Sequence, residues 1–162
     1  MGKALKLWSL LAGALILMAG AAGLYAVSGG VSASTQLRPD DEALTRLGGE
    51  IYVQSCASCH GADLKAEEDW RKGNPDGTLK APPHDETGHT WHHADELLFR
   101  ITKFGTAEAV GLKDFTSNMP AFQDSLTDQQ IIAVLSWIKA QWPDEIKDRH
   151  DLMNERARNQ SQ

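Results

Sequence analysis

The chain has 162 residues, of which 41% are hydrophobic, and a formal net charge of −6, as expected for one domain of ordinary size with extra terminal segments. The charge is uneven, because residues 34–162 carry 14 Lys and Arg against 22 Asp and Glu, a net charge of −8. No basic stripe is present, so the composition argues against a nucleic-acid-binding protein and favours positively charged protein partners.

The N-terminal segment is apolar and uncharged from Leu7 to Val27, a run of 21 residues that follows Lys3 and Lys6. Small residues just after the run suit a signal peptidase, which predicts an export signal. The run is also close to the ~20 residues that span a bilayer, so an uncleaved membrane anchor is the other interpretation. Either way, residues 1–33 predict export to the periplasm, with any anchor in the inner membrane of a bacterium.

The first expected helix follows a linker over residues 34–41, which are mostly small or polar. It runs from Glu42 toward Cys56, because acidic residues suit a helix N-terminus and apolar residues recur on one face. Those apolar residues are Leu44, Leu47, Ile51 and Tyr52. Residues 61–88 are interrupted repeatedly by glycine and proline, which predicts a long ordered loop.

Two further helices are expected in the second half of the chain. One covers Asp95 to Lys103 and is ended by Gly105. After a loop, the other begins near Thr127 and ends before Pro143. Its apolar residues at helical spacing are Ile131, Val134, Leu135 and Ile138. Residues 144–162 are highly charged and predict an exposed helical tail, and the absence of strand alternation predicts an all-α core over residues 42–143.

Both cysteines of the chain lie in the run Cys56-Ala57-Ser58-Cys59-His60. This is the pattern for c-type haem attachment, in which two thiols form thioether bonds to the haem vinyl groups and the following histidine binds iron. We therefore predict that Cys56 and Cys59 hold one haem c covalently and that His60 binds its iron. The preceding export segment supports this interpretation of a short pattern.

Closely spaced cysteines also occur in other kinds of site. A thioredoxin-like dithiol needs a βαβ surrounding that this sequence lacks, and a disulfide across so short a loop would stabilise little. A structural zinc site needs four ligands. With no second cysteine pair, the remaining ligands would have to be histidines: His84, His89, His92 and His93.

A second iron ligand is expected far along the chain, and Met119 is the candidate, 59 residues beyond His60. A thioether is a soft, neutral ligand that favours reduced iron and so raises the redox potential. Met119 precedes Pro120 in a predicted loop, which argues against ordinary core packing. The alternative is a sixth ligand from the four histidines at 84–93, which could instead form a second metal site.

The residues from Leu44 to Trp142 resemble the class I cytochrome c family. The resemblance rests on the cysteine run, on Gly48 and Tyr52 before it, and on later matches. These are Asn118, Met119, Pro120, Leu135, Trp137 and Ile138. It implies a cytochrome c fold of three to four core helices around one haem, in which the first and last helices cross closely at the glycine and the aromatic residues fill the crossing.

The resemblance also implies contacts around the haem. A proline carbonyl, from Pro82 or Pro83, is expected to accept a hydrogen bond from the outer ring nitrogen of His60 and to fix its orientation. Trp91 resembles a residue that lies near the haem propionates in similar small cytochromes. The insert from Asp63 to Lys80 departs from the shortest family members.

Together, these features predict a single-haem electron carrier and not an enzyme, since two axial ligands leave no open iron position. Its partners would be redox proteins of the respiratory chain with basic docking surfaces, and no nucleic acid. Two other functions are compatible with the sequence: a haem-binding subunit or accessory of a larger membrane oxidoreductase, and a haem-based sensor from which Met119 dissociates.

Overall fold

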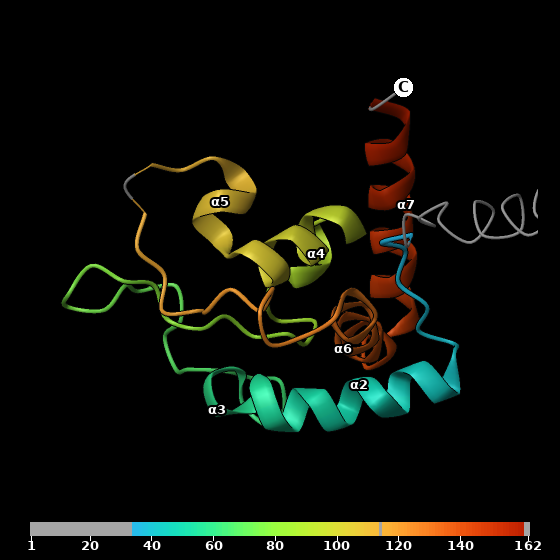
Figure 1. Cartoon of the computed structure of the whole chain (residues 1–162), viewed down its shortest axis with the longest axis horizontal. Coiled ribbons are helices and arrows are strands. Elements are labelled where there is room, and N and C mark those ends of the chain that lie inside the picture. The colour runs from blue at the N-terminus through green and yellow to red at the C-terminus, as the bar shows by residue number, and fades with distance from the viewer. Residues whose placement is uncertain (1–33, 114, 161–162) are drawn as a thin grey trace, which may run out of the picture. The chain divides into compact units, whose positions relative to one another are not determined.

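The first described helix begins where an aspartate caps it. The computed structural model describes residues 34–113 and 115–160, in which α2 spans Glu42–Ser55 (Figure 1). The side chain of Asp41 accepts a hydrogen bond from the backbone N–H of Leu44 at 3.0 Å. This bond satisfies one of the amide groups that a helix start leaves without an intrahelical partner. The buried residues of α2 are Leu44, Gly48, Ile51 and Tyr52.

Helix α6, over Asp128–Ala140, is the centre of the hydrophobic core. It starts with a capping box: the Thr127 hydroxyl accepts from the Gln130 N–H, and the Gln130 side chain accepts from the Thr127 N–H at 2.9 Å. Ile131 and Val134 are almost completely buried. The expected spacing and cap are therefore confirmed.

The predicted close crossing of the first and last core helices is also confirmed. Figure 1 shows α6 end-on where it passes α2. A Cβ atom added at Gly48 would lie 2.1 Å from the carbonyl oxygen of Ala133, so only glycine permits this approach. Beside it, the rings of Tyr52 and Trp137 pack with centroids 4.6 Å apart.

Helix α4, over Asp95–Phe104, matches its prediction and ends where Gly105 adopts a φ of +86°. A short helix that the sequence did not predict, α5 (Thr106–Val110), follows directly. The residue before α4, Ala94, offers no side chain to cap the helix. The cap comes instead from α7, where the Asn154 side-chain oxygen accepts a hydrogen bond from the Asp95 N–H at 2.8 Å.

The charged tail forms helix α7 over Asp144–Gln160, and the prediction that this helix is exposed is wrong for one face. His150 is completely buried, and Asn154 is 6% exposed. These two residues belong to a polar group shared by α4, α6 and α7, which we call the polar seam and in which only Asp151 is exposed. Its members are Asp95, Lys139, His150, Asp151 and Asn154.

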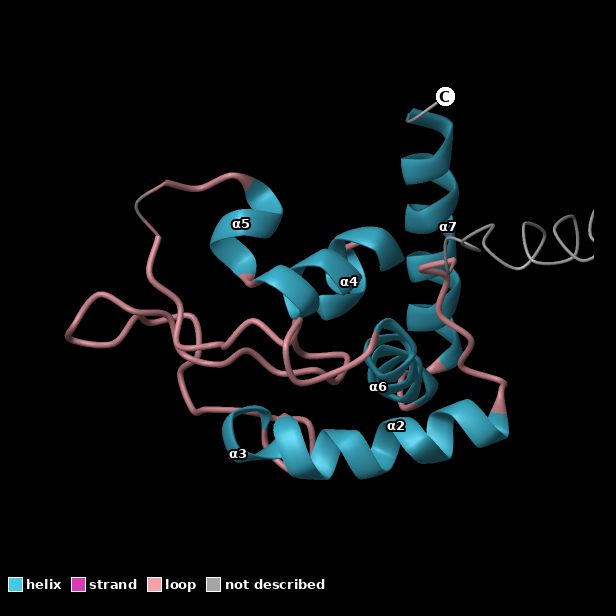
Figure 2. Cartoon of the chain, in the orientation of Figure 1, coloured by secondary structure: helices cyan, strands magenta, loops and turns pink. Residues whose placement is uncertain are grey.

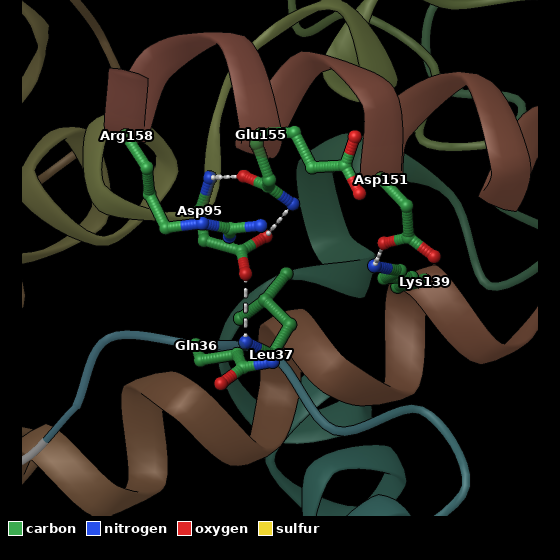
Figure 3. A pocket seen from close by; sticks show the side chains of 8 residues that line it. Gln36, Leu37, Asp95, Lys139, Asp151, Glu155 and Arg158 are labelled. Carbon is green, nitrogen blue, oxygen red and sulfur yellow. Dashed lines mark hydrogen bonds and ion pairs between the residues drawn. The ribbon is translucent and has the colours of Figure 1, made fainter. Parts of the chain in front are cut away.

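The polar seam borders a cavity of about 270 Å³ (Figure 3). In Figure 3 the carboxylate of Asp95 accepts from the Leu37 N–H, at 2.9 Å, and Lys139 pairs with Asp151. These two contacts join Leu37, in the segment before α2, to α4, and α6 to α7. None of the predicted haem-binding residues lines this cavity.

Loops connect the helices at the end of the domain away from α7 (Figure 2). Only α3 (Ala57–His60) and the short 3₁₀ helix η1 (Thr90–His92) lie between α2 and α4. Residues 34–113 and 115–160 contain no strand, and the predicted all-α cytochrome c fold is confirmed. The predicted export segment, residues 1–33, lies outside the described residues. No helix of the described ranges is long and apolar enough to cross a bilayer.

Candidate haem site

Helix α2 positions the cysteine run at its C-terminal end. The N–H of Cys56 donates to the carbonyl of Tyr52 at 2.9 Å, and α3 then carries the run through His60 in a single turn. Cys56 is half-buried, Cys59 is exposed and His60 is buried. The local fold therefore keeps both thiols and the histidine on one short helical turn at the edge of the core.

The ring of His60 is held by the carbonyl of Pro82, which accepts a hydrogen bond from Nδ1 at 2.8 Å. Of the two prolines that the sequence offered as acceptors, Pro82 and Pro83, the structure shows that Pro82 makes this bond. With Nδ1 as donor, Nε2 is the nitrogen available to a metal, and the carbonyl fixes the tautomer and orientation of the ring. Burial lowers the pKa of His60, against the raising effect of the Pro82 carbonyl, which favours the neutral imidazole that iron requires.

The segment after His60 is tied back to α2 and to the later loop. The Tyr52 hydroxyl donates to the carbonyl of Gly61 at 2.8 Å. The carbonyl of Leu64 accepts from the His84 N–H, also at 2.8 Å. The second bond brings Pro82 near His60, because it holds the segment after His60 against residues 82–84.

Before haem attachment, the surroundings of the Cys56 thiol favour its protonated form. Burial, followed by the proximity of Cys59, raises the pKa of Cys56 to about 11. Redox-active dithiols depend on a lowered thiol pKa, because the thiolate is the nucleophile. Cys56 therefore does not have the lowered pKa of the activated cysteine in a thioredoxin-like dithiol, one of the alternatives raised by the sequence.

The histidines that could compete with Met119 for iron are arranged for other contacts. The His84 ring stacks on the ring of His60, with centroids 4.0 Å apart and planes 23° apart, and its Nδ1 lies 2.8 Å from the Thr90 hydroxyl. Rings in face-to-face contact leave no space between them, so His84 could not bind the same iron from the side opposite His60.

The other histidines lie among aromatic side chains. His89 stacks on Trp70 at 5.2 Å and makes an edge contact with His93, and His92 contacts Trp91. In the described part of the chain, no group of three or more His, Cys, Asp or Glu residues is placed to hold a metal ion. The second metal site that the sequence allowed therefore has no support from this geometry.

Met119 lies, half-buried, in the loop between α5 and α6, as the sequence predicted. The side chain of the preceding Asn118 donates to the hydroxyl of Thr78 at 3.1 Å, and Thr78 belongs to the long loop after the cysteine run. The structure thus joins the loop that carries Met119 to the long loop that follows His60. Sequence reasoning missed Thr78, since its 40-residue separation from Asn118 leaves no local signal.

The donor atoms suit a haem c in their chemistry. Two thiols at the required spacing can form thioethers, the buried neutral imidazole of His60 can bind iron through Nε2, and Met119 offers a thioether. When bound, the haem supplies an iron that gains or loses one electron. The protein's own residues would hold the haem, and the Pro82 carbonyl orients the ring of His60. The roles of the four predicted site residues, Cys56, Cys59, His60 and Met119, remain predictions.

Comparisons with known proteins point to the same chemistry. A family model described as "Cytochrome C oxidase, cbb3-type, subunit III" matches residues 43–138, more than half of the chain. The gluconate 2-dehydrogenase cytochrome c subunit of Pantoea cypripedii is 29% identical over 101 residues, which are 60% of this chain and 20% of that protein. This chain therefore aligns with about a fifth of that relative's length. No solved structure matches the chain.

Proposed function

Since the chain belongs to the cytochrome c family described by the cbb3-type oxidase subunit III model, we propose that it carries electrons between redox partners at a membrane or in the periplasm. It is an electron-carrying protein with covalently attached haem c. The single run from Cys56 to His60 accounts for one haem.

One observation carries the proposal: the hydrogen bond from His60 Nδ1 to the Pro82 carbonyl, which prepares the ring to bind iron. If Met119 bound the iron together with His60, no position would be left open for a substrate. The protein would then act as a carrier without catalysing a reaction of its own. Met ligation also favours the reduced iron, as suits an acceptor of electrons from donors of moderate potential.

The test is a comparison of Met119→Ala with the wild-type holoprotein. Loss of the thioether should remove the weak long-wavelength absorption band of Met-ligated ferric haem and let carbon monoxide bind the ferrous form. The potential should fall by an amount on the order of 0.1 V, a part of the ~0.8 V range that axial ligands set. Spectroscopy with carbon monoxide and a redox titration measure these changes.

Met153→Ala is the matched control, because Met153 is the other methionine in the described chain and lies on α7. It should keep the wild-type spectrum and potential. A pyridine haemochrome assay should show thioether-linked haem in all three proteins. If Met119→Ala retained the band and excluded carbon monoxide, Met119 would not be the ligand.

We propose that the partners are redox proteins of a respiratory chain with basic docking surfaces, since residues 34–162 carry a net charge of −8. Export to the periplasm, with a possible inner-membrane anchor in residues 7–27, is part of the same proposal and rests on the N-terminal sequence. Electron-transfer rates with a basic partner should fall as salt rises, because screening weakens the attraction. Rates independent of ionic strength would exclude steering by charge.

A second function is favoured by the similar protein from Pantoea cypripedii, whose name describes a cytochrome c subunit of a dehydrogenase. This chain could likewise serve as the haem-binding subunit of a larger membrane oxidoreductase. Purification of the native protein from detergent-solubilised membranes distinguishes the two functions. A free carrier should elute alone, whereas a subunit should elute with dehydrogenase or oxidase activity.

A further inference from the structure

Among the described residues, one side-chain hydrogen bond links the Met119 loop to the insert after the cysteine run. We propose that Thr78 positions Met119 by anchoring the side chain of Asn118, so that the insert governs how readily Met119 leaves the iron. We call residues 74–78 the insert turn. The inference rests on the proposed function, because it requires Met119 to be the second iron ligand.

The hydroxyl of Thr78 uses its full hydrogen-bonding capacity. It accepts from the side-chain amides of Asn74, at 3.0 Å, and Asn118, at 3.1 Å, and it donates to the Asp76 carboxylate at 2.7 Å. A hydroxyl has one proton and two acceptor positions, so no capacity remains for water. Thr78 is 6% exposed, which makes the loss of any of these partners costly.

The insert turn is itself well ordered by hydrogen bonds. The backbone N–H of Asn74 donates to the Thr78 carbonyl at 2.8 Å, and the Asp76 carboxylate also accepts from the Thr78 N–H at 3.0 Å. The two hydrogen bonds from Thr78 lower the pKa of Asp76, so this carboxylate is charged at neutral pH. A charged acceptor polarises the Thr78 hydroxyl and strengthens its acceptance of the Asn118 amide.

The Met119 loop is held on both sides of the methionine. On one side Asn118 binds Thr78. On the other side the N–H of Phe122 donates to the Thr102 carbonyl at 3.1 Å, which fixes the loop to the end of α4. Met119 lies between these two ties. Loss of the first tie should therefore increase the fraction of molecules in which Met119 has moved away from the iron.

A second turn of the same kind provides an internal comparison. The hydroxyl of Thr87 donates to the Asp85 carboxylate at 2.6 Å, and that carboxylate also accepts from the Thr87 N–H at 2.9 Å. Thr87 is exposed. Within the described ranges, its hydroxyl bonds only inside its own turn. The two turns share their local chemistry and differ in the link to Asn118.

The experiment measures the rate at which carbon monoxide binds the reduced full-length holoprotein, since binding requires Met119 to leave the iron. Thr78→Val keeps the side-chain shape and removes the hydroxyl. The rate should rise about 2- to 12-fold, the range given by the net contribution of one hydrogen bond. Thr78→Ser retains the hydroxyl and should restore a rate near wild type. Thr87→Val, the matched control, should leave the rate unchanged.

A second variant identifies the bond responsible. Asn118→Leu should also raise the rate, and the double variant should be no faster than Thr78→Val alone, because Thr78→Val already removes the bond to Asn118. If Thr78→Val fails to incorporate haem, Asn118→Leu decides the question by itself. A wild-type rate in the variant that folds, or full additivity of the two changes, would overturn the proposal.

Failure of this inference is distinguishable from failure of the proposed function. If Met119→Ala opens the iron to carbon monoxide but Thr78→Val behaves as wild type, Met119 remains the ligand and only the role of Thr78 is wrong. If Met119→Ala leaves the rate unchanged, the predicted ligand itself is wrong, and the positioning role fails with it.

Discussion

At the crossing of α2 and α6, Gly48 lies so close to the backbone of Ala133 that no side chain fits. At the polar seam, by contrast, polar side chains from three helices bind one another. Asn154 shows this best, because its amide accepts from the Asp95 N–H and donates to the Asp95 carboxylate, at 2.8 and 3.0 Å. The first contact depends on shape and the second on matched donors and acceptors.

The difference determines which changes each contact tolerates. A packed apolar crossing is disrupted by an added atom, because the neighbours cannot move without strain. A buried polar group is disrupted by a lost partner, because the remaining donor or acceptor stays desolvated and unpaired. Substitutions at the two contacts should therefore differ in both kind and size.

The largest effect is expected for Gly48→Ala. Its Cβ would lie 2.1 Å from the Ala133 oxygen and 2.8 Å from Cβ of Trp137, which forces α2 and α6 apart. We expect a loss of about 3 kcal/mol or more in the free energy of unfolding, at the upper end for overpacked sites. Urea unfolding of the holoprotein, followed by tryptophan fluorescence and circular dichroism, measures this loss.

Gly49→Ala, at the next position of α2, is the matched control. Its Cβ would meet the Trp137 side chain at 3.0 Å, a tight contact with a ring and not with backbone. The better helix propensity of alanine, about 1 kcal/mol over glycine, offsets that contact. The change should stay within about 1 kcal/mol. Equal losses in the two variants would contradict the assignment of the close approach to Gly48.

A smaller loss is expected when the polar seam loses Asn154. In Asn154→Ala, the Asp95 N–H at the start of α4 loses its acceptor and the Asp95 carboxylate loses one donor. The free energy of unfolding should fall by about 1–3 kcal/mol, the cost of unpaired buried groups. Thermal unfolding measures it, and Asn159→Ala on the exposed part of α7 should change stability far less. If the two variants lost similar amounts of unfolding free energy, the hydrogen bonds of Asn154 in the seam would not be the cause of the loss.

The two contacts also differ in how well the sequence predicts them. Helices α2, α4 and α6 were predictable because apolar spacing and capping residues are local signals. The polar seam was not, because Asp95 and Asn154 are 59 residues apart and both are polar types that are usually exposed. The tail was therefore predicted as exposed, whereas His150 and Asn154 are buried.

The parts of the haem site also differ in how well the sequence predicts them. Cys56, Cys59 and His60 form a contiguous motif and could be named from the sequence. The choice of Pro82 over Pro83 depends on how the loop folds back on His60, which involves a contact 22 residues away. The hydrogen bond between Thr78 and Asn118 likewise joins two loops that are distant in the sequence, and no pattern of residue types predicts it.

The smallest of the three effects concerns the response of the polar seam to pH. Burial, followed by the charge of Lys139, lowers the pKa of His150, and these outweigh the opposing effects of Asp95, the His93 carbonyl and Asp151. The folded protein therefore keeps His150 neutral where the unfolded chain, with an ordinary pKa of about 6.5, takes up a proton. Since the unfolded state then binds more protons, stability should fall as pH drops below that value.

His150→Gln should reduce this loss, because glutamine does not titrate and its amide can still donate to the His93 carbonyl, as His150 Nε2 does at 2.9 Å. Unfolding free energies of both proteins at about pH 7.5 and 5.5 measure the difference around the ordinary histidine pKa. The other histidines are common to both proteins, so the difference isolates His150. His92→Gln, at an exposed histidine, should retain the wild-type loss. If His150→Gln lost as much stability on acidification as wild type, the seam would respond to acid through its carboxylates instead.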